Sequence, residues 1–373
     1  MRRIKKCTVF LLVLCLLLNL AGCAAAQKPL RVTLVLKTVT EVAEFWGTLL
    51  SGVEKAAEEY GVELKVLTSP REIDIDKQIE LIRQVTADKP DVMILSAADY
   101  DRCAEATEEA IAAGIGVVAI DTDVNAAGRA CFVGSNSYEI GLEMGRAMAS
   151  YLPEGGKVAV IQHMLTTTTG IERTRGVLDA LNEAGNIEIL GSFCCDNSTE
   201  QAQTITTELL SADPEIRGFV CTNEVCNVGA ANALVELGMG GRVYVVGCDN
   251  SQRQIQFLEQ NIIQAIVTQR PFNMGYVAVQ QAVRVANGEQ TDDFVEVSCV
   301  LITRENIVHA GKPEAPVPSF ALSGFDRSRF RSTPKNTHNF GRGGALLRPA
   351  ECTESSEILG EFVCICAFRC RGG

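Results

Sequence analysis

The chain has 373 residues, a formal net charge of −12 and 47% hydrophobic residues. Because this length exceeds that of one typical core, we expect two medium-sized domains. The acidic balance argues against nucleic acid as a partner, since binding to phosphates requires a basic surface.

The N-terminus has the pattern of an export signal. The basic residues Arg2, Arg3, Lys5 and Lys6 precede the apolar run Val9–Leu18, which is shorter than a membrane-spanning helix. Leu20-Ala21-Gly22-Cys23 follows and resembles the bacterial lipobox, whose cysteine is acylated and becomes the new N-terminus. We expect residues 1–23 to be a lipoprotein signal peptide and Cys23 to anchor an extracytoplasmic protein to the cell membrane. The alternative is that Cys23 is an ordinary residue of a cysteine-rich chain.

From Leu30, short apolar runs of strand length alternate with amphipathic helical segments. The predicted strands are Val32–Leu36, Glu63–Leu67, Val92–Leu95 and Val117–Ile120, and the predicted helices are Phe45–Tyr60, Asp76–Ala87 and Tyr100–Ala113. This alternation predicts a parallel sheet with helices on both faces.

The same alternation begins again after residues 134–136. The predicted strands are Lys157–Ile161, Ile187–Leu190, Phe219–Cys221 and Val243–Val246, with helices that begin at Ser137, Ile171, Thr199 and Asn223. A last section, Ala265–Val267, Asn273–Asn287 and Val295–Leu301, is too short for a third domain, so we expect it to complete the first two.

From about Gly311 the pattern is lost. Prolines interrupt the chain and no strand or helix period is sustained. We expect residues 311–373 to be an irregular tail that is disordered or was appended by a shift of reading frame. Cys364, Cys366 and Cys370 lack a fourth ligand at a recognised spacing, so no metal site is expected there.

The chain has 15 cysteines, and several in the central region lie in or beside apolar segments, where cysteine behaves as a small hydrophobic residue. An exported protein normally pairs its cysteines. Because the spacing does not support a disulfide scaffold, we expect free thiols and a reducing habitat.

Polar side chains follow the predicted strands, at the edge where open parallel sheets bind ligands. Carboxylates and amides hydrogen-bond to vicinal hydroxyls, an arginine donates in a fork, and an aromatic ring covers the apolar face of a sugar. Each signal has a second interpretation: an aspartate after a strand also caps helices or closes turns, and the single tryptophan also suits core packing. Together they favour a polyhydroxylated ligand. The residues concerned include Lys37, Phe45, Trp46, Asp121, His163, Arg173, Asn223, Asp249 and Gln269.

No catalytic arrangement is recognisable. The sequence has no H-E-x-x-H, no G-x-S-x-G and no phosphate-binding glycine loop. We therefore expect a protein that is not an enzyme and that uses no cofactor or metal.

The order of several segments resembles the periplasmic sugar-binding proteins of the ribose-binding type, the receptors of ABC importers. The likeness covers about Leu30–Ile307. The segments are Val35-Leu36-Lys37-Thr38, Phe45-Trp46, Ala119-Ile120-Asp121, Phe132-Val133-Gly134-Ser135-Asn136, Arg173-x-x-Gly176, Asn223-Glu224, Val245-Val246-Gly247-Cys248-Asp249 and Gln269-Arg270-Pro271.

The resemblance implies a type I periplasmic binding fold, an α/β architecture with two doubly wound parallel-sheet lobes joined by three crossing strands. The crossings are expected near Val133–Asn136, Gln269–Pro271 and Phe294–Val297. The N-terminal lobe would span residues 29–133 plus 270–294, and the C-terminal lobe residues 134–269 plus 295–310. The ligand would lie between the lobes, which close about it by a hinge motion.

The resemblance also implies a binding site in which Phe45 and Trp46 sandwich the sugar ring. Asp121, Arg173, Asn223, Asp249 and Gln269 would supply its hydrogen bonds. The chain departs from the family pattern where Thr122 replaces an arginine, Asn197 and Cys248 replace aromatic residues, and Glu41–Glu44 replaces Asn-Pro. Ribose itself is therefore not implied, and the added glutamates favour a donor-rich or cationic ligand.

These observations predict a lipid-anchored, monomeric protein that captures a sugar or related polyol for an ABC permease. Its partners would be that permease, the membrane through the anchor, and no nucleic acid. A sensor subunit for a chemoreceptor or histidine kinase remains the alternative. A repressor of the lactose type shares the implied fold but requires a DNA-binding helix-turn-helix where this chain has its signal.

Overall fold

Two six-stranded sheets organise the residues that the computed structural model describes, which are 28–38 and 44–307. Several predictions lie outside these residues: the signal peptide with Cys23, Glu41 at the expected mouth of the site, and the tail 311–373 with its cysteines.

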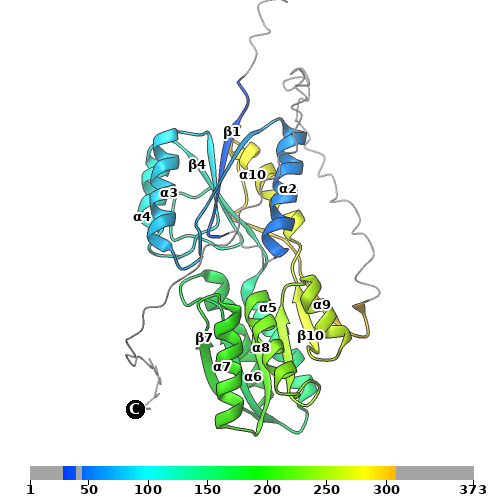
Figure 1. Cartoon of the computed structure of the whole chain (residues 1–373). Coiled ribbons are helices and arrows are strands. Elements are labelled where there is room, and N and C mark those ends of the chain that lie inside the picture. The colour runs from blue at the N-terminus through cyan, green and yellow to red at the C-terminus, as the bar shows by residue number, and fades with distance from the viewer. Residues whose placement is uncertain (1–27, 39–43, 308–373) are drawn as a thin grey trace, which may run out of the picture. The chain divides into compact units, whose positions relative to one another are not determined.

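The first sheet has the strand order β11-β5-β4-β3-β1-β2, and all of its pairs are parallel. Helices α2 (Glu44–Tyr60) and α10 (Pro271–Ala286) cover one face, and α3 (Ile75–Asp88) and α4 (Ala104–Ala112) cover the other (Figure 1). We call this unit the N-lobe. Its strands are β1 (Arg31–Leu36), β2 (Glu63–Thr68), β3 (Val92–Leu95), β4 (Gly116–Ile120), β5 (Cys131–Gly134) and β11 (Phe294–Glu296).

The second sheet, in what we call the C-lobe, has the strand order β12-β10-β9-β8-β6-β7. Helices α5 (Ser137–Tyr151) and α6 (Thr168–Ala184) cover one face. Helices α7 (Thr199–Ala212), α8 (Glu224–Glu236) and α9 (Gln252–Glu259) cover the other. Its strands are β6 (Gly156–Gln162), β7 (Ile187–Cys194), β8 (Ile216–Cys221), β9 (Tyr244–Cys248), β10 (Ala265–Thr268) and β12 (Val300–Thr303).

The strands are apolar on both faces because both faces of each sheet are covered. In β1, Leu34 packs against the side of α2 and α10, whereas Val35 packs against the side of α3 and α4, and both are fully buried. In β6, Val160 and Ile161 divide in the same way between the two faces of the second sheet. The structure thus confirms the predicted class of two doubly wound α/β lobes, with one exception: β12 runs antiparallel to β10.

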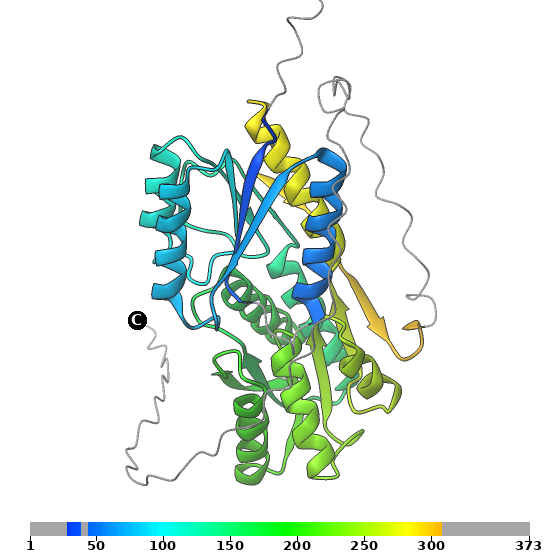
Figure 2. The same ribbon diagram turned by 45° about the horizontal axis from the view of Figure 1, so that its top comes forward.

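The chain passes between the two sheets three times within the described part. It leaves the first sheet after β5, returns between β10 and α10, and leaves again between β11 and β12. Helix α10 therefore lies beside α2, far from it in sequence, as Figures 1 and 2 both show. The run Val295–Leu301, expected as one segment, is divided between the sheets, because Val295 pairs with Val133 of β5 and Leu301 with Val267 of β10.

Helix α9 is missing from the sequence-based prediction. It has only eight residues, and a capping box holds its start: the Gln254 N–H donates to the Ser251 hydroxyl (3.3 Å), and the Ser251 N–H donates to the Gln254 side chain (2.9 Å). The Ser-x-x-Gln spacing was the available signal. Helix α6 similarly begins at Thr168 rather than Ile171, because the Thr167 hydroxyl caps it.

The cysteines of the described residues form no disulfide with one another in this structure. Most are buried in the cores, and the closest pair brings the Cys195 and Cys226 sulfurs to 3.4 Å. Over residues 28–38 and 44–307, no helix is both long enough and apolar enough to cross a membrane.

Candidate functional site

One cavity is lined by residues from both lobes, most of which follow the carboxyl ends of strands. It contains about 420 Å³ of empty space, part of it open to solvent. The structure brings all seven predicted ligand-binding residues together in its wall, although their role in binding stays a prediction. The lining residues are Lys37, Phe45, Trp46, Glu72, Asp121, His163, Thr169, Arg173, Asn197, Asn223, Glu224, Val225, Asp249 and Gln269.

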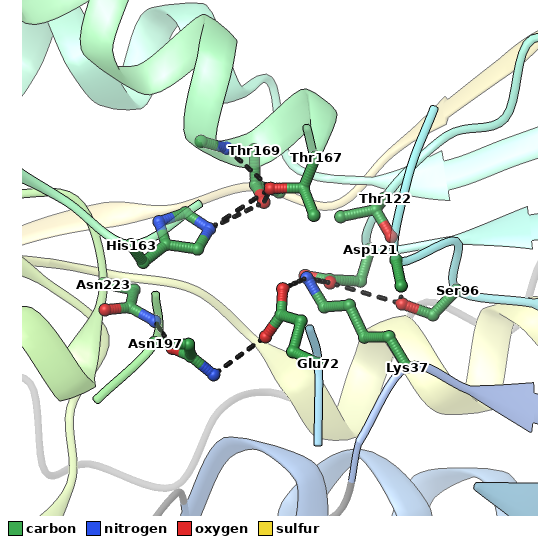
Figure 3. A network of polar contacts seen from close by, with 12 residues as sticks. Lys37, Glu72, Ser96, Asp121, Thr122, His163, Thr167, Thr169, Asn197 and Asn223 are labelled. Atoms are coloured by element: carbon green, nitrogen blue, oxygen red, sulfur yellow. Dashed lines mark hydrogen bonds and ion pairs between the residues drawn. The ribbon is translucent and has the colours of Figure 1, made fainter. Parts of the chain in front are cut away.

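The N-lobe half of the cavity contains a buried ion cluster around Lys37. The Lys37 Nζ lies 2.8 Å from Glu72 Oε1 and 3.3 Å from Asp121 Oδ2 (Figure 3), and all three side chains are almost fully buried. Burial alone would lower the Lys37 pKa, but the two carboxylates outweigh it and raise that pKa above its usual value. Lys37 therefore stays charged at physiological pH.

A hydrogen-bonded bridge joins this cluster to the C-lobe. The Asn197 amide donates to Glu72 Oε2 (2.8 Å), and the Asn223 amide donates to Asn197 Oδ1 (2.8 Å), as Figure 3 shows. Asn197 follows β7 and Asn223 caps α8, whereas Glu72 follows β2 in the N-lobe. The position where the resemblance implied an aromatic residue thus holds an amide that links the two lobes.

Asp121 and Asp249 occupy equivalent places in the two lobes. Asp121 directly follows β4 and Asp249 directly follows β9, and both have left-handed backbones, with φ of 62° and 72°. Each backbone N–H donates to the neighbouring strand, Asp121 to Val133 O (3.0 Å) and Asp249 to Val267 O (2.9 Å). Aspartate tolerates this conformation better than most residues. The turn places both carboxyl groups in the cavity wall.

In the C-lobe half, two carboxyl groups lie together. Asp249 Oδ2 accepts the backbone N–H of Glu224 (3.0 Å), and Asp249 Oδ1 accepts the Gln269 amide (2.7 Å). Burial and the nearby Asp249 raise the pKa of the Glu224 carboxyl to about 8. Without a ligand, Glu224 is therefore largely protonated at neutral pH.

His163 and Arg173 share Thr222 as a partner. The His163 Nδ1 lies 2.7 Å from the Thr222 hydroxyl and its Nε2 3.2 Å from the Thr169 hydroxyl. Burial, together with the positive charges of Lys37 and Arg173, holds the His163 pKa well below its usual value, so the ring is neutral. Arg173 donates to the Thr222 carbonyl oxygen (2.9 Å) and stays charged.

Two glycines bring α6, which carries Arg173, close to α5. A Cβ on Gly141 would lie 2.2 Å from the Arg173 carbonyl oxygen, and a Cβ on Gly176 would lie 2.3 Å from the Tyr138 carbonyl oxygen. Larger residues at either position would push the helices apart. The Arg173-x-x-Gly176 spacing therefore has a packing role as well as a place in the site.

The predicted aromatic sandwich is wrong. The Phe45 and Trp46 rings touch edge to face, with centroids 5.1 Å apart and planes at 88°, so no slot for a sugar ring exists between them. Trp46 is 5% exposed, packs in the N-lobe core and also lines the cavity. Both interpretations of Trp46, core packing and ligand contact, are thus compatible with its position.

Glu72 is the main residue that sequence reasoning missed. It lies in the loop after β2, and this position after a strand was the available signal. The wall also contains Lys37, His163, Asn197 and Glu224, which were not among the seven predicted ligand-binding residues. In the described part of the chain, no group of histidine, cysteine and acidic residues could hold a metal ion.

A family model described as the periplasmic binding protein domain matches residues 33–290 of the chain. The chain belongs to this family. This assignment confirms the resemblance seen in the sequence. The family and its curated relatives are substrate-binding proteins, so the chain is a binding protein and not an enzyme.

Curated relatives of this periplasmic binding protein include a D-allose-binding periplasmic protein of Escherichia coli. It is 25% identical over 78% of this chain and 96% of its own length. A D-ribose/D-allose-binding protein of Pseudomonas aeruginosa is 26% identical over 74% of this chain and 89% of its own length.

Solved structures agree with the fold. A sugar transporter protein from Clostridium phytofermentans matches with a TM-score of 0.69 and 29% identity, covering 73% of this chain and 98% of that chain. A glucose-galactose binding protein from Geobacillus stearothermophilus matches with a TM-score of 0.71 and 26% identity, covering 75% and 99%.

Proposed function

We propose that this protein captures a sugar or related polyol outside the cytoplasm and delivers it to an ABC permease. The observation that carries the proposal is the cavity itself, in which buried charged and amide side chains from both lobes converge beside two aromatic rings. Such an inventory suits a ligand with several hydroxyl groups. The names of the relatives, which bind D-allose and D-ribose, point to the same ligand class.

Asp121, Arg173, Asn223, Asp249 and Gln269 are the proposed hydrogen-bonding groups. One buried nitrogen of the wall, Arg173 Nε, and one buried oxygen, Glu224 Oε2, have no hydrogen-bond partner among the described residues. Buried polar atoms are normally paired, so these two are suited to a ligand. Phe45 and Trp46 would contact the apolar part of the ligand from one side.

The ligand specificity is expected to differ from that of ribose receptors. Thr122, where the resemblance implied an arginine, is buried and donates to the Ala97 carbonyl oxygen (2.7 Å), so it supplies no cation to the cavity. Cys248 is buried in the C-lobe core, and Asn197 bridges to Glu72. The wall is therefore more polar and less aromatic than the family pattern implies.

Hinge closure and lipid anchoring complete the proposal. The three passages of the chain between the sheets are short, which suits rotation of one lobe against the other. The Leu20–Cys23 motif supports attachment of a monomer to the membrane that holds the permease. Mass spectrometry of the protein from its native membrane tests the anchor, and an N-terminus other than an acylated Cys23 would rule it out.

Ligand binding is tested by a thermal-shift screen of the full chain against pentoses, hexoses, inositols and furanosyl sugars. A ligand present well above its dissociation constant raises the unfolding midpoint. Arg173→Ala and Asp249→Ala should each abolish the shift. If no sugar or polyol stabilises the folded protein, the proposed function is wrong; if both variants bind normally, the proposed residues are wrong.

A further inference from the structure

Two buried carboxyl groups lie together in the C-lobe half of the cavity, and Arg173 acts on Asp249 with its positive charge. Glu224 is 4% exposed and Asp249 is 6% exposed. Within residues 28–38 and 44–307, the ion pairs within 4 Å include neither of them, in contrast to Glu72 and Asp121, which share Lys37. A buried charge without a partner is costly, so Glu224 stays largely protonated in the empty site and would ionise beside a bound cation.

The partners of both carboxyl groups are neutral. Asp249 accepts from a backbone N–H and from the Gln269 amide. Glu224 accepts from the Ser251 side chain, but its Oε2 is buried and has no hydrogen-bond partner in the described part of the protein. That oxygen lies in a residue of the cavity wall, where a ligand can supply the missing donor.

Nearby negative charges make ionisation of Glu224 more costly. Asp249 and Glu44 both act on it with negative charge. Arg173, the cation of this half, acts on Asp249 with its positive charge, while its Nη1 donates to the Thr222 carbonyl oxygen. Four buried acidic groups thus line the cavity, Glu72, Asp121, Glu224 and Asp249, whereas its buried cations are Lys37 and Arg173.

Building on the proposed function, we propose that the sugar or polyol bound here carries a protonated amine, held jointly by Glu224 and Asp249. An ammonium group has three donors and a positive charge, so it satisfies the unpartnered Glu224 Oε2 and balances the two acids. The hydroxyls of the ligand remain for Asn223, Arg173 and Asp121. Glu224 is then the residue that selects an amino sugar or amino polyol over its neutral parent.

The test compares matched ligands by isothermal titration calorimetry on the purified full chain. The probes are glucose, galactose and mannose, each with its 2-amino-2-deoxy and N-acetylamino counterpart, together with ribose and allose. We expect at least one amino sugar to bind ten-fold or more tightly than its neutral parent. The N-acetyl compound, which keeps the nitrogen but loses the charge, should bind no better than the parent.

Proton release gives a second readout. A bound cation favours the ionised carboxylate, and the pKa of Glu224 in the empty site is about 8. At pH 7, binding of the amino sugar should therefore release a proton, measured as a dependence of the binding heat on the ionisation enthalpy of the buffer. Binding of a neutral sugar should show no such dependence.

Glu224→Gln keeps the size of the side chain and removes its charge. It should weaken binding of the amino sugar at least ten-fold and abolish the buffer dependence. Asp249→Asn should also weaken binding of the amino sugar, and asparagine tolerates the left-handed backbone at this position. This second variant shows whether the loss in Glu224→Gln comes only from a structural defect at Glu224. Glu259→Gln changes an exposed acid on α9 of the same lobe and should alter affinity less than two-fold.

The outcomes separate this inference from the proposed function. If a neutral sugar binds and no amino sugar binds more tightly, the cationic ligand is ruled out while sugar binding stands. The same holds if Glu224→Gln binds the amino sugar as well as the parent protein does. If the folded protein binds neither class, both proposals fail together.

Discussion

Asp121 and Asp249 have the same backbone conformation in the two lobes, but their carboxyl groups have different partners. Both follow a central strand, both have positive φ, and both N–H groups pair with the next strand. Asp121 is neutralised within the protein by Lys37, and its carboxylate also accepts from Ser96 (3.5 Å). Asp249 has only neutral donors and lies beside a second acid, Glu224.

Equivalent positions in the two lobes therefore need not have equivalent roles. The acids of the N-lobe half form ion pairs with Lys37, so these charges contribute to the stability of the empty protein. Glu224 and Asp249 of the C-lobe half form no ion pair within 4 Å among the described residues, so ionising Glu224 costs stability unless a ligand supplies a cation. Four substitutions test this distinction, from the largest expected effect to the smallest.

Lys37→Met should destabilise the protein most. It removes the cation from two buried carboxylates, and loss of one partner of a buried ion pair costs about 3–5 kcal/mol. Urea unfolding at pH 7 gives the free energy. The control is Lys65→Met, which breaks an exposed ion pair with Asp88 and should cost less than about 1 kcal/mol. Equal losses would show that the N-lobe cluster is not a stabilising element.

Glu224→Gln should stabilise the ligand-free protein at alkaline pH. The folded pKa of about 8 lies above the ordinary value of 4.5, so the contribution of Glu224 is fully present below pH 4.5 and is lost as pH rises through about 8. Between pH 5 and pH 9 the free energy of unfolding of the parent protein should fall by about 4 kcal/mol more than that of the variant. If the free energy of unfolding depended on pH in the same way in both proteins, Glu224 would not destabilise the folded state when it ionises.

His163→Asn should reduce the dependence of the free energy of unfolding on pH below pH 6.5. The folded pKa of His163 is depressed below 6.5, so its contribution is present above pH 6.5 and is lost as pH falls below that value. As pH falls from 6.5 to 5, the free energy of unfolding of the parent should fall more steeply than that of the variant, by at most about 1.4 kcal/mol per pH unit. Because other groups titrate equally in both proteins, the difference isolates His163. Identical slopes would mean that the ring is charged in the folded state.

Asn197→Ala should have the smallest effect, about 1 kcal/mol, because it removes one bridge between the halves. A double-mutant cycle with Glu72→Gln, followed by urea unfolding, measures the coupling between these two side chains. Additive losses would show that the two halves are energetically independent in spite of the hydrogen bond between them.

Much of the architecture was predictable because it depends on local patterns. Buried parallel strands are continuous apolar runs, so β3 was predicted with its observed bounds, Val92–Leu95. Short elements were not predictable in this way: α9 depends on a capping box, and the division of Val295–Leu301 between β11 and β12 depends on which sheet offers a free edge. Periodicity contains neither kind of information.

The site was predictable as a set of residues but not as an arrangement. The rule that ligands bind at the carboxyl ends of parallel strands selected Asp121 and Asp249, which line the cavity with the other predicted residues. The same rule would have found Glu72 after β2. That Phe45 and Trp46 meet edge to face, rather than on opposite sides of a ligand, depends on how α2 packs on its sheet.

The sequence by itself determined the α/β class, the two-lobed plan and the family, since hydrophobic periodicity and the order of short motifs are written along the chain. Only the tertiary structure decided which charges neutralise one another. Lys37 meets Glu72 and Asp121 across three separate loops, whereas Glu224 and Asp249 lie together and form no ion pair within 4 Å among the described residues. Electrostatic balance depends on distances of a few ångströms between residues far apart in sequence, and no linear pattern specifies those distances.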